Sequence, residues 1–240
     1  MSGGGQRRRP GRVRTSAAVP QRPFGRVRRT YAPIEVLSAD HIATLHNKAL
    51  RVLAEVGMRV LDEGARARFA AAGAAVKKET VFLDPGLVAE RLTTVPRAFS
   101  LAARNPARDL YFGGEDCVFA SVGGPAYVMD NDGGRREGTY EEMCNYLRLV
   151  QSLNILHQEG GCPFEPLDLP ANTRHLDIYK AQITLLDKNW QTQTLGRART
   201  LDGLELAAIA LGLETVDLVS RPTLLGIINT NSPLQLDIPM

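Results

Sequence analysis

The most regular pattern in the chain is a short apolar run that ends abruptly in polar residues. Leu224–Ile228 is one such run, and the polar residues Asn229–Ser232 follow it directly. Comparable runs occupy Ile155–Gly161 and Trp190–Gly196, and a less regular one begins near Cys117. A buried parallel strand has this pattern when it ends in a loop that presents polar groups. The starts lie roughly 35 residues apart with helical patterns between them, so the pattern predicts about four repeated β/α units.

Three amphipathic helices are predicted before these units. Ser38 is a typical N-cap, and apolar residues at helical spacing follow it up to Gly57, which ends the helix. A second helix is expected from Glu63 to Ala72, and a third from the Asp84-Pro85 pair to about Thr94. We therefore predict a helical N-terminal region over residues 34–110.

The β/α portion, residues 111–240, contains further start and stop signals. Thr139 and Glu142 form a capping box that opens a helix to about Leu153. Asn131–Gly134 is a turn signal after a short strand. The remaining predicted elements are strands at 118–121, 126–129, 155–158, 190–195 and 224–228, and helices at about 173–186 and 201–211.

The first 33 residues differ from the rest of the chain in composition. Nine arginines and no acidic residue lie within the first 30 positions, whereas the remainder carries more acidic than basic residues. A Gly-, Pro- and Arg-rich segment with few apolar residues buries too little surface to fold, so residues 1–33 are expected to be a disordered tail. A solubilising tail, a nucleic-acid or anionic-surface arm and an organelle transit peptide are the three interpretations of it.

The remaining totals are those of an ordinary globular protein. Apolar residues make up 44% of the chain, and no run approaches the roughly 18 residues of a membrane helix. The N-terminus has no apolar core of a secretory signal. Three cysteines without C-x-x-C spacing argue against a disulfide framework, so a reducing, cytoplasmic setting is expected.

Candidate site residues lie at the predicted strand ends, because ligands of parallel β/α folds gather there. We predict a substrate wall formed by Glu159, Gln193, Asn229 and Asn231. Such neutral and hydrogen-bonding groups suit a small polar or zwitterionic molecule. No Gly-rich phosphate loop occurs, and no catalytic residue can be assigned.

One of the predicted strand ends contains the residue types of a metal site. His157, Glu159 and Cys162 are all types that bind zinc, but no second cluster completes a tetrahedral set, so no metal is predicted. Aromatic side chains hold quaternary ammonium groups, yet Trp190, Phe164 and Tyr127 are better explained by core or rim packing.

A set of short motifs spread from residue 34 to 240 carries a family resemblance. The motifs are Leu37-Ser38, Ala72-Gly73-Ala74, Ala103-Arg104-Asn105-Pro106, Gly123-Gly124-Pro125, Asp130 with Gly133–Arg136, Glu165–Asp168, Asp187-Lys188, and Asn229–Leu234 with Asp237. In these the chain resembles the trimethylamine methyltransferase family, corrinoid-dependent enzymes with a TIM-type barrel.

The resemblance implies a function. It implies transfer of a methyl group from trimethylamine or a quaternary amine, such as a betaine, to a corrinoid (cobalamin) carried on a separate partner protein. Members of the family are about twice as long as this chain, and the position of pyrrolysine in some of them has no counterpart here. We therefore expect a partial TIM-type (β/α)8 barrel, an incomplete fragment with little activity of its own and poor solubility.

Two alternatives to this interpretation remain open. One is a non-enzymatic α/β binding protein, with an open four-stranded sheet and a nucleic-acid-binding basic arm. The other is a small-molecule barrel lyase with similar strand ends. A corrinoid protein and a small methylated amine are the expected partners, without a membrane, and the oligomeric state is left open.

Overall fold

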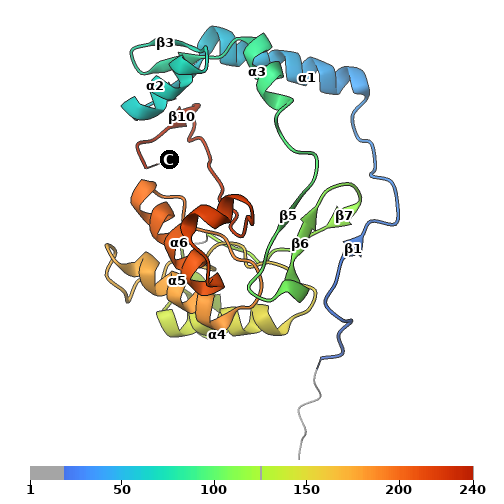
Figure 1. The fold of residues 1–240 in the computed structure, drawn as a ribbon, viewed down its shortest axis with the longest axis vertical. Coiled ribbons are helices and arrows are strands. Elements are labelled where there is room, and N and C mark those ends of the chain that lie inside the picture. The colour runs from blue at the N-terminus through green and yellow to red at the C-terminus, as the bar shows by residue number, and fades with distance from the viewer. Residues whose placement is uncertain (1–18, 125, 240) are drawn as a thin grey trace, which may run out of the picture.

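The computed structural model describes residues 19–124 and 126–239, which form a mixed α/β arrangement (Figure 1). The helices are α1 Ala39–Arg51, α2 Glu63–Ala71, α3 Pro85–Leu92, α4 Tyr140–Ser152, α5 Arg174–Leu185 and α6 Arg197–Leu211, with short helical turns η1 Val52–Val56, η2 Pro106–Arg108 and η3 Thr215–Val219. The strands are β1 Val27–Arg28, β2 Met58–Val60, β3 Ala75–Lys77, β4 Thr80–Phe82, β5 Phe99–Leu101, β6 Leu110–Phe112, β7 Asp116–Cys117, β8 Val128–Asp130, β9 Gly134–Arg136 and β10 Gln235–Leu236.

The predicted ends of the first three helices are confirmed. The side chain of Ser38 accepts a hydrogen bond from the His41 amide, and Gly57 ends the π-helical extension of α1 with a φ of 79°. Asp62 and Asp84 cap α2 and α3 in the same way. Each cap supplies an acceptor to an amide that has no partner within its helix.

Short strands, which the sequence pattern did not predict, lie between these helices. β2, β3 and β4 form a four-stranded sheet with β10, in the order β10-β2-β4-β3. Val60 and Val81 are fully buried in this sheet, where Phe69 of α2 and Leu87 of α3 pack around them. Figure 1 shows β10 returning from the C-terminal part of the chain to this group of helices. The strands are only two or three residues long, too short for an alternating pattern to stand out.

Helices α4, α5 and α6 enclose the larger core. Met143, Leu147 and Val150 lie at helical spacing on α4 and are buried. They pack with Ile178 and Tyr179 of α5 and with neighbouring apolar groups. None of the helices within 19–124 and 126–239 is both long and apolar enough to cross a bilayer.

The predicted parallel segments lie side by side, but they do not form the long strands of a barrel. Single parallel bridges link Ala120 to Gln158, Gln158 to Asn189, and Gln191 to Leu225. The segments therefore follow one another in chain order, with α4, α5 and α6 in the intervals. The described residues contain several small sheets and no closed barrel, so a TIM-type barrel is not confirmed. Pairing at one or two residues is too short to count as a regular strand.

Residues 21–29 of the predicted tail, which we call the N-terminal arm, contact the rest of the chain; residues 1–18 lie outside the described residues. β1 pairs antiparallel with β7, and Arg26 forms two hydrogen bonds to Asp116 at 2.7 and 2.5 Å. At the other end of the arm, Gln21 bonds to the chain just after α4. Composition missed this because the arm adds to a surface that is already folded and needs no core of its own.

The family motif that contains Asn105 contacts the motif Asp187-Lys188. The Asp187 carboxylate accepts from Asn105 at 3.0 Å and from Gln151 at 2.6 Å. The buried ammonium of Lys188 donates to the carbonyl oxygens of Val150 and Leu153, at the C-terminal end of α4. Desolvation lowers the pKa of Lys188 to about 8. Lys188 thus provides hydrogen-bond donors to carbonyl groups at the C-terminal end of α4, which would otherwise be unpaired in the interior.

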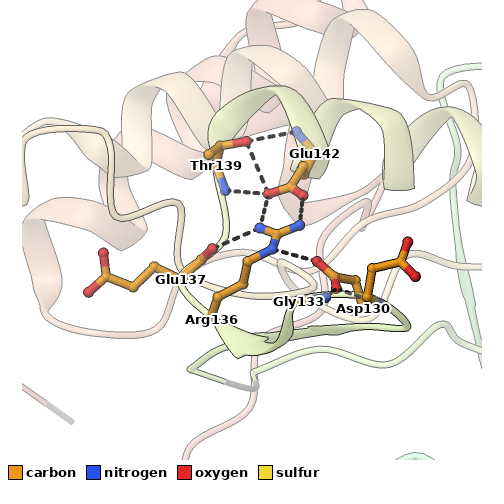
Figure 2. Close-up of polar contacts among 7 residues, drawn as sticks. Asp130, Gly133, Arg136, Glu137, Thr139 and Glu142 are labelled. Carbon is orange, nitrogen blue, oxygen red and sulfur yellow. Dashed lines mark hydrogen bonds and ion pairs between the residues drawn. The ribbon is translucent and has the colours of Figure 1, made fainter.

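A third motif forms the hairpin that precedes α4 (Figure 2). Arg136 of β9 donates to Asp130 of β8 and to Glu142 of α4, and Glu142 closes the predicted capping box with Thr139. The hairpin turn is held by Asp130, which also accepts from the Gly133 amide. These bonds fix the hairpin on the first turn of the helix.

This ion-pair cluster predicts an acid-dependent loss of stability. Its hydrogen bonds lower the pKa of Glu142 from 4.5 to about 2, with Arg136 as the main cause. A carboxylate with a depressed folded-state pKa stabilises the protein above pH 4.5, and this contribution is lost as the pH falls toward 2. We expect Glu142→Gln to show a smaller loss of stability than the parent between pH 5.5 and 3, measured by urea unfolding. Glu141→Gln, at an exposed neighbouring position, should behave as the parent.

Candidate functional site

The two faces of the parallel segments carry different side chains. Trp190 belongs to the core beneath α5 and α6, and Thr192 bonds to the hydroxyl of Tyr179 at 3.0 Å. Both residues therefore face the helices. Because side chains alternate along an extended segment, Gln191 and Gln193 face the opposite side. The same alternation and the bridge between them place Gln158 and Asn189 there as well. A row of amide side chains results, which we call the amide face: Gln158, Asn189, Gln191 and Gln193.

Glu159 lies on the helix-facing side and is completely buried. Gln182 of α5 donates to one of its carboxylate oxygens at 2.9 Å, and the other has no partner among the described residues. Burial raises the pKa of Glu159, whereas the backbone amides of Gly161, Cys162 and Gln191 favour its ionised form. The hydrogen bond from Gln182 thus joins the segment that carries Glu159 to α5.

Backbone contacts between two loops require glycine at the ends of the first two segments. A Cβ on Gly160 would lie 1.9 Å from the Ser121 carbonyl oxygen, and one on Gly123 would lie 2.1 Å from the Gly160 oxygen. The Gly124 amide donates to the Cys162 oxygen at 2.9 Å. The motif containing Gly123 and Gly124 therefore serves a close approach of two chains, and it fixes the rim beside the amide face.

The structure brings together only some of the predicted wall residues. Gln193 is half-buried on the amide face, and its backbone amide donates to the Tyr179 hydroxyl at 3.0 Å. Asn229 is exposed just beyond the neighbouring segment, whose Ile227 oxygen accepts from Thr194 at 2.6 Å. Asn231 lies in the turn before β10, where it donates to the Asp237 carboxylate and bridges to Gln235.

Sequence reasoning missed Gln182 and Gln191. Gln182 lies within the buried face of α5, beside Ile178 and Tyr179, and a polar residue in an apolar helical stripe was the available signal. Gln191 follows Trp190 at the start of a predicted strand, a position that gave no reason to expect a ligand-facing side chain.

The possible metal ligands His157, Glu159 and Cys162 form hydrogen bonds to different partners. His157 bonds to Phe119 and Gly25, Glu159 to Gln182, and the Cys162 thiol to the Phe164 oxygen. Burial raises the pKa of Cys162 to about 12, so the thiol stays protonated. No group of three or more candidate ligands converges within the described ranges.

This arrangement suits orientation of a small molecule. Gln158 and Asn189 are buried, and the Asn189 amide donates to the Ala102 and Thr223 carbonyl oxygens. Gln191 and Gln193 are half-buried, and their uncharged amide groups can donate to and accept from a polar or zwitterionic ligand without changing its protonation state.

Comparisons with known proteins agree with the resemblance seen in the motifs. Residues 2–240 match the family described as trimethylamine methyltransferase (MTTB). A glycine betaine methyltransferase from Desulfitobacterium hafniense is 31% identical over 202 residues, which is 84% of this chain and 42% of that protein. An L-carnitine:corrinoid methyltransferase from Eubacterium limosum is 27% identical over 62% of this chain and 30% of its own length. A proline betaine:corrinoid methyltransferase from the same organism is 26% identical over 82% of this chain.

The chain spans less than half of the length of these relatives. The matched region nevertheless includes the N-terminal sheet, the parallel segments and the amide face. With the family match extending over residues 2–240, the chain belongs to the trimethylamine methyltransferase family.

Proposed function

We propose that the chain takes part in moving a methyl group from a quaternary amine of the betaine type to a corrinoid on a separate protein. The observation that carries this proposal is the family match over residues 2–240. The names of the relatives supply the substrate class, since three of them act on glycine betaine, carnitine or proline betaine. The corrinoid, when present on its partner, supplies the cobalt atom that takes up the methyl group.

The chemistry of the substrate agrees with the side chains of the amide face. A quaternary nitrogen carries no proton, so its demethylation needs no general base at nitrogen. The protein has to orient the methyl carbon and hold the rest of the molecule. We propose that Gln193 and Gln191 bind the polar end of the substrate through their amide groups, and that Asn229 contributes from the adjacent rim.

The rim beside these residues suits a partner that arrives from solution. Ile228 is 65% exposed directly before Asn229, and Leu195 is 46% exposed two residues after Gln193. Exposed apolar side chains next to polar ones are common at protein interfaces. A corrinoid carried by a partner could reach the amide face over this rim. The parallel segments would then be consecutive strands of a barrel, with their carboxyl ends toward the partner.

Glu159 has a different role in this proposal from that of a substrate ligand. Its complete burial and the hydrogen bond from Gln182 make it a positioning residue, which joins the second parallel segment to α5. Asn231 is engaged in the turn before β10, and that turn would have to rearrange for its side chain to bind the substrate. The proposed contacts therefore do not include it.

The test is a methyl-transfer assay with the protein and a reduced corrinoid protein. The 240 residues alone are expected to form little methyl-cobalt, since they span less than half of the length of the relatives. In a version extended to the length of the relatives we expect methyl-cobalt to form, followed by its absorbance, with at least one amine from a panel of glycine betaine, carnitine, proline betaine and trimethylamine. Mass spectrometry should detect the demethylated product. Gln193→Ala should raise KM by about tenfold, as expected for the loss of one hydrogen bond to a charged group. Lys180→Ala, on the exposed side of α5, is the control. Absence of methyl-cobalt with every amine would refute the proposal.

A further inference from the structure

The N-terminal arm is held on the body by a buried histidine. His157 is 3% exposed and lies at the start of the second parallel segment. Phe24 of the arm contacts its imidazole edge-on, with ring centroids 5.4 Å apart, and Phe119 lies on another side at 5.8 Å. The arm thus shields this imidazole from solvent.

Hydrogen bonds fix the protonation state of the ring. The Phe119 amide donates to Nδ1 of His157 at 3.0 Å, so Nδ1 carries no proton. The other nitrogen, Nε2, lies 3.1 Å from the Gly25 carbonyl oxygen and donates its proton to it. Only the neutral imidazole makes both bonds. A second proton on Nδ1 would oppose the Phe119 N–H, and the ring would have to leave its position.

The charges around the ring also disfavour a second proton. Both cations lie against Phe24, the residue that contacts the imidazole. The guanidinium carbon of Arg108 is 4.4 Å from the centre of the Phe24 ring, and the Lys188 ammonium is 5.9 Å from it. The titratable or charged groups on the elements packed around His157 are Arg26, Arg28, Arg108, Asp109, Tyr111, Glu115, Asp116, Cys117, Asp187 and Lys188. The nearer carboxylates are engaged elsewhere: Asp116 pairs with Arg26, Asp187 is held by Asn105 and Gln151, and Asp109 accepts from the Ala103 amide.

We propose that His157 is an acid-sensitive latch, which holds the N-terminal arm on the body when neutral and releases it when protonated. The released segment is residues 21–29. Besides Phe24 and Gly25, it contacts the body through Gln21, the Arg26–Asp116 and Arg28–Glu115 ion pairs and the β1–β7 pair, and the contacts of Phe24 and Gly25 are those that involve His157. Movement of the imidazole breaks the bond to Gly25 and removes the surface on which Phe24 rests. The proposal does not depend on the methyl-transfer function.

The direction of the pH effect follows from linkage. Burial lowers the pKa of His157 from its ordinary value of 6.5, and the charge of Lys188 acts in the same direction. The detached state therefore binds the proton more tightly, so docking is strongest above pH 6.5 and weakens as the pH falls below it. The Arg26 partner holds the pKa of Asp116 below 3.8, so Asp116 stays ionised at pH 5 and its protonation does not cause the loss of docking.

Hydrogen exchange of the arm, corrected for the intrinsic rate at each pH, tests the latch. The Arg29 amide donates to the Glu115 oxygen at 2.8 Å and reports on docking. We expect its protection to fall about tenfold between pH 7.5 and 5. His157→Gln offers an NH2 donor group and a carbonyl acceptor but does not titrate, so the protection of Arg29 in this variant should be the same at both pH values. His46→Gln, at an exposed position on α1, should retain the parent response.

Two results would overturn the latch. One is equal protection of the arm at both pH values in the parent protein, and the other is a fall that persists in His157→Gln. Should that variant lack protection at either pH, imidazole NMR of the parent decides the matter. The titration midpoint of His157 must then coincide with the midpoint of arm release, and separate midpoints would refute the proposal.

Discussion

Gly160→Ala is expected to destabilise the protein by about 3 kcal/mol, at the upper end of the range for overpacking in a closely packed region. The added Cβ would lie 1.9 Å from the carbonyl oxygen of Ser121, and a backbone oxygen cannot move aside as a flexible side chain can. The Gly160 amide also donates to the hydroxyl oxygen of Ser121 at 3.0 Å, so the two loops must separate and lose this bond. Denaturant unfolding of the parent and the variant measures the difference.

Gly25→Ala is the matched control for this substitution. Gly25 is exposed, and a Cβ there would have no atom within 4 Å. Its stability should stay within about 0.5 kcal/mol of the parent. If Gly160→Ala unfolds at the same denaturant concentration as Gly25→Ala, the loops that carry Ser121 and Gly160 do not approach each other as closely as described. Because the same loops border the amide face, Gly160→Ala should also weaken substrate binding in the methyl-transfer assay.

Tyr179→Phe should lower the free energy of unfolding by about 2–3 kcal/mol, because it removes a hydroxyl that joins three groups in the interior. The Tyr179 hydroxyl donates to the Arg199 oxygen at 2.9 Å and accepts from the Gln193 amide at 3.0 Å, with Thr192 also at 3.0 Å. The ring itself is fully buried and keeps its packing in the variant. What is lost is the pairing of buried polar groups.

Thermal and denaturant unfolding of Tyr31→Phe provide the comparison, since the Tyr31 side chain is 83% exposed. This control should be indistinguishable from the parent. If Tyr179→Phe is as stable as the parent, the backbone groups of Gln193 and Arg199 must find other hydrogen-bond partners. The hydroxyl of Tyr179 would then not be what holds Gln193 on α5. In the assay, Tyr179→Phe should raise KM along with its loss of stability, because the segment carrying Gln193 loses an anchor.

The sequence predicted most of the helices because their caps and periods are local. Ser38, Thr139 and Gly57 act on residues within one or two turns, so their effects can be read without knowing the fold. The order of the parallel segments was also predictable, since consecutive β/α units place neighbours in sequence side by side. Short strands such as β2 were missed because their partners come from distant positions.

The site was harder to predict for the same reason. A shift of one position moves a residue of an extended segment from the face toward the helices to the opposite face. The apolar run before Glu159 does not indicate on which of the two faces Glu159 lies. Contact with Gln182 places Glu159 on the helix side, and no local pattern announced this contact. The docking of the arm through Phe24 depends on cations at Arg108 and Lys188, which lie far along the chain.

The pairing of β10 with β2 has a consequence for how the chain acquires its structure. Arg59 and Gln235, which are register partners and also share a side-chain hydrogen bond, are separated by 176 residues. Contacts between such distant positions require closure of a long loop, and they slow the search for the native state. During synthesis, β2 leaves the ribosome long before β10 exists, and one edge of β2 waits without a partner. A strand edge in that condition is open to pairing with other chains, so the interval before residue 236 emerges is when we expect chaperone binding to matter most.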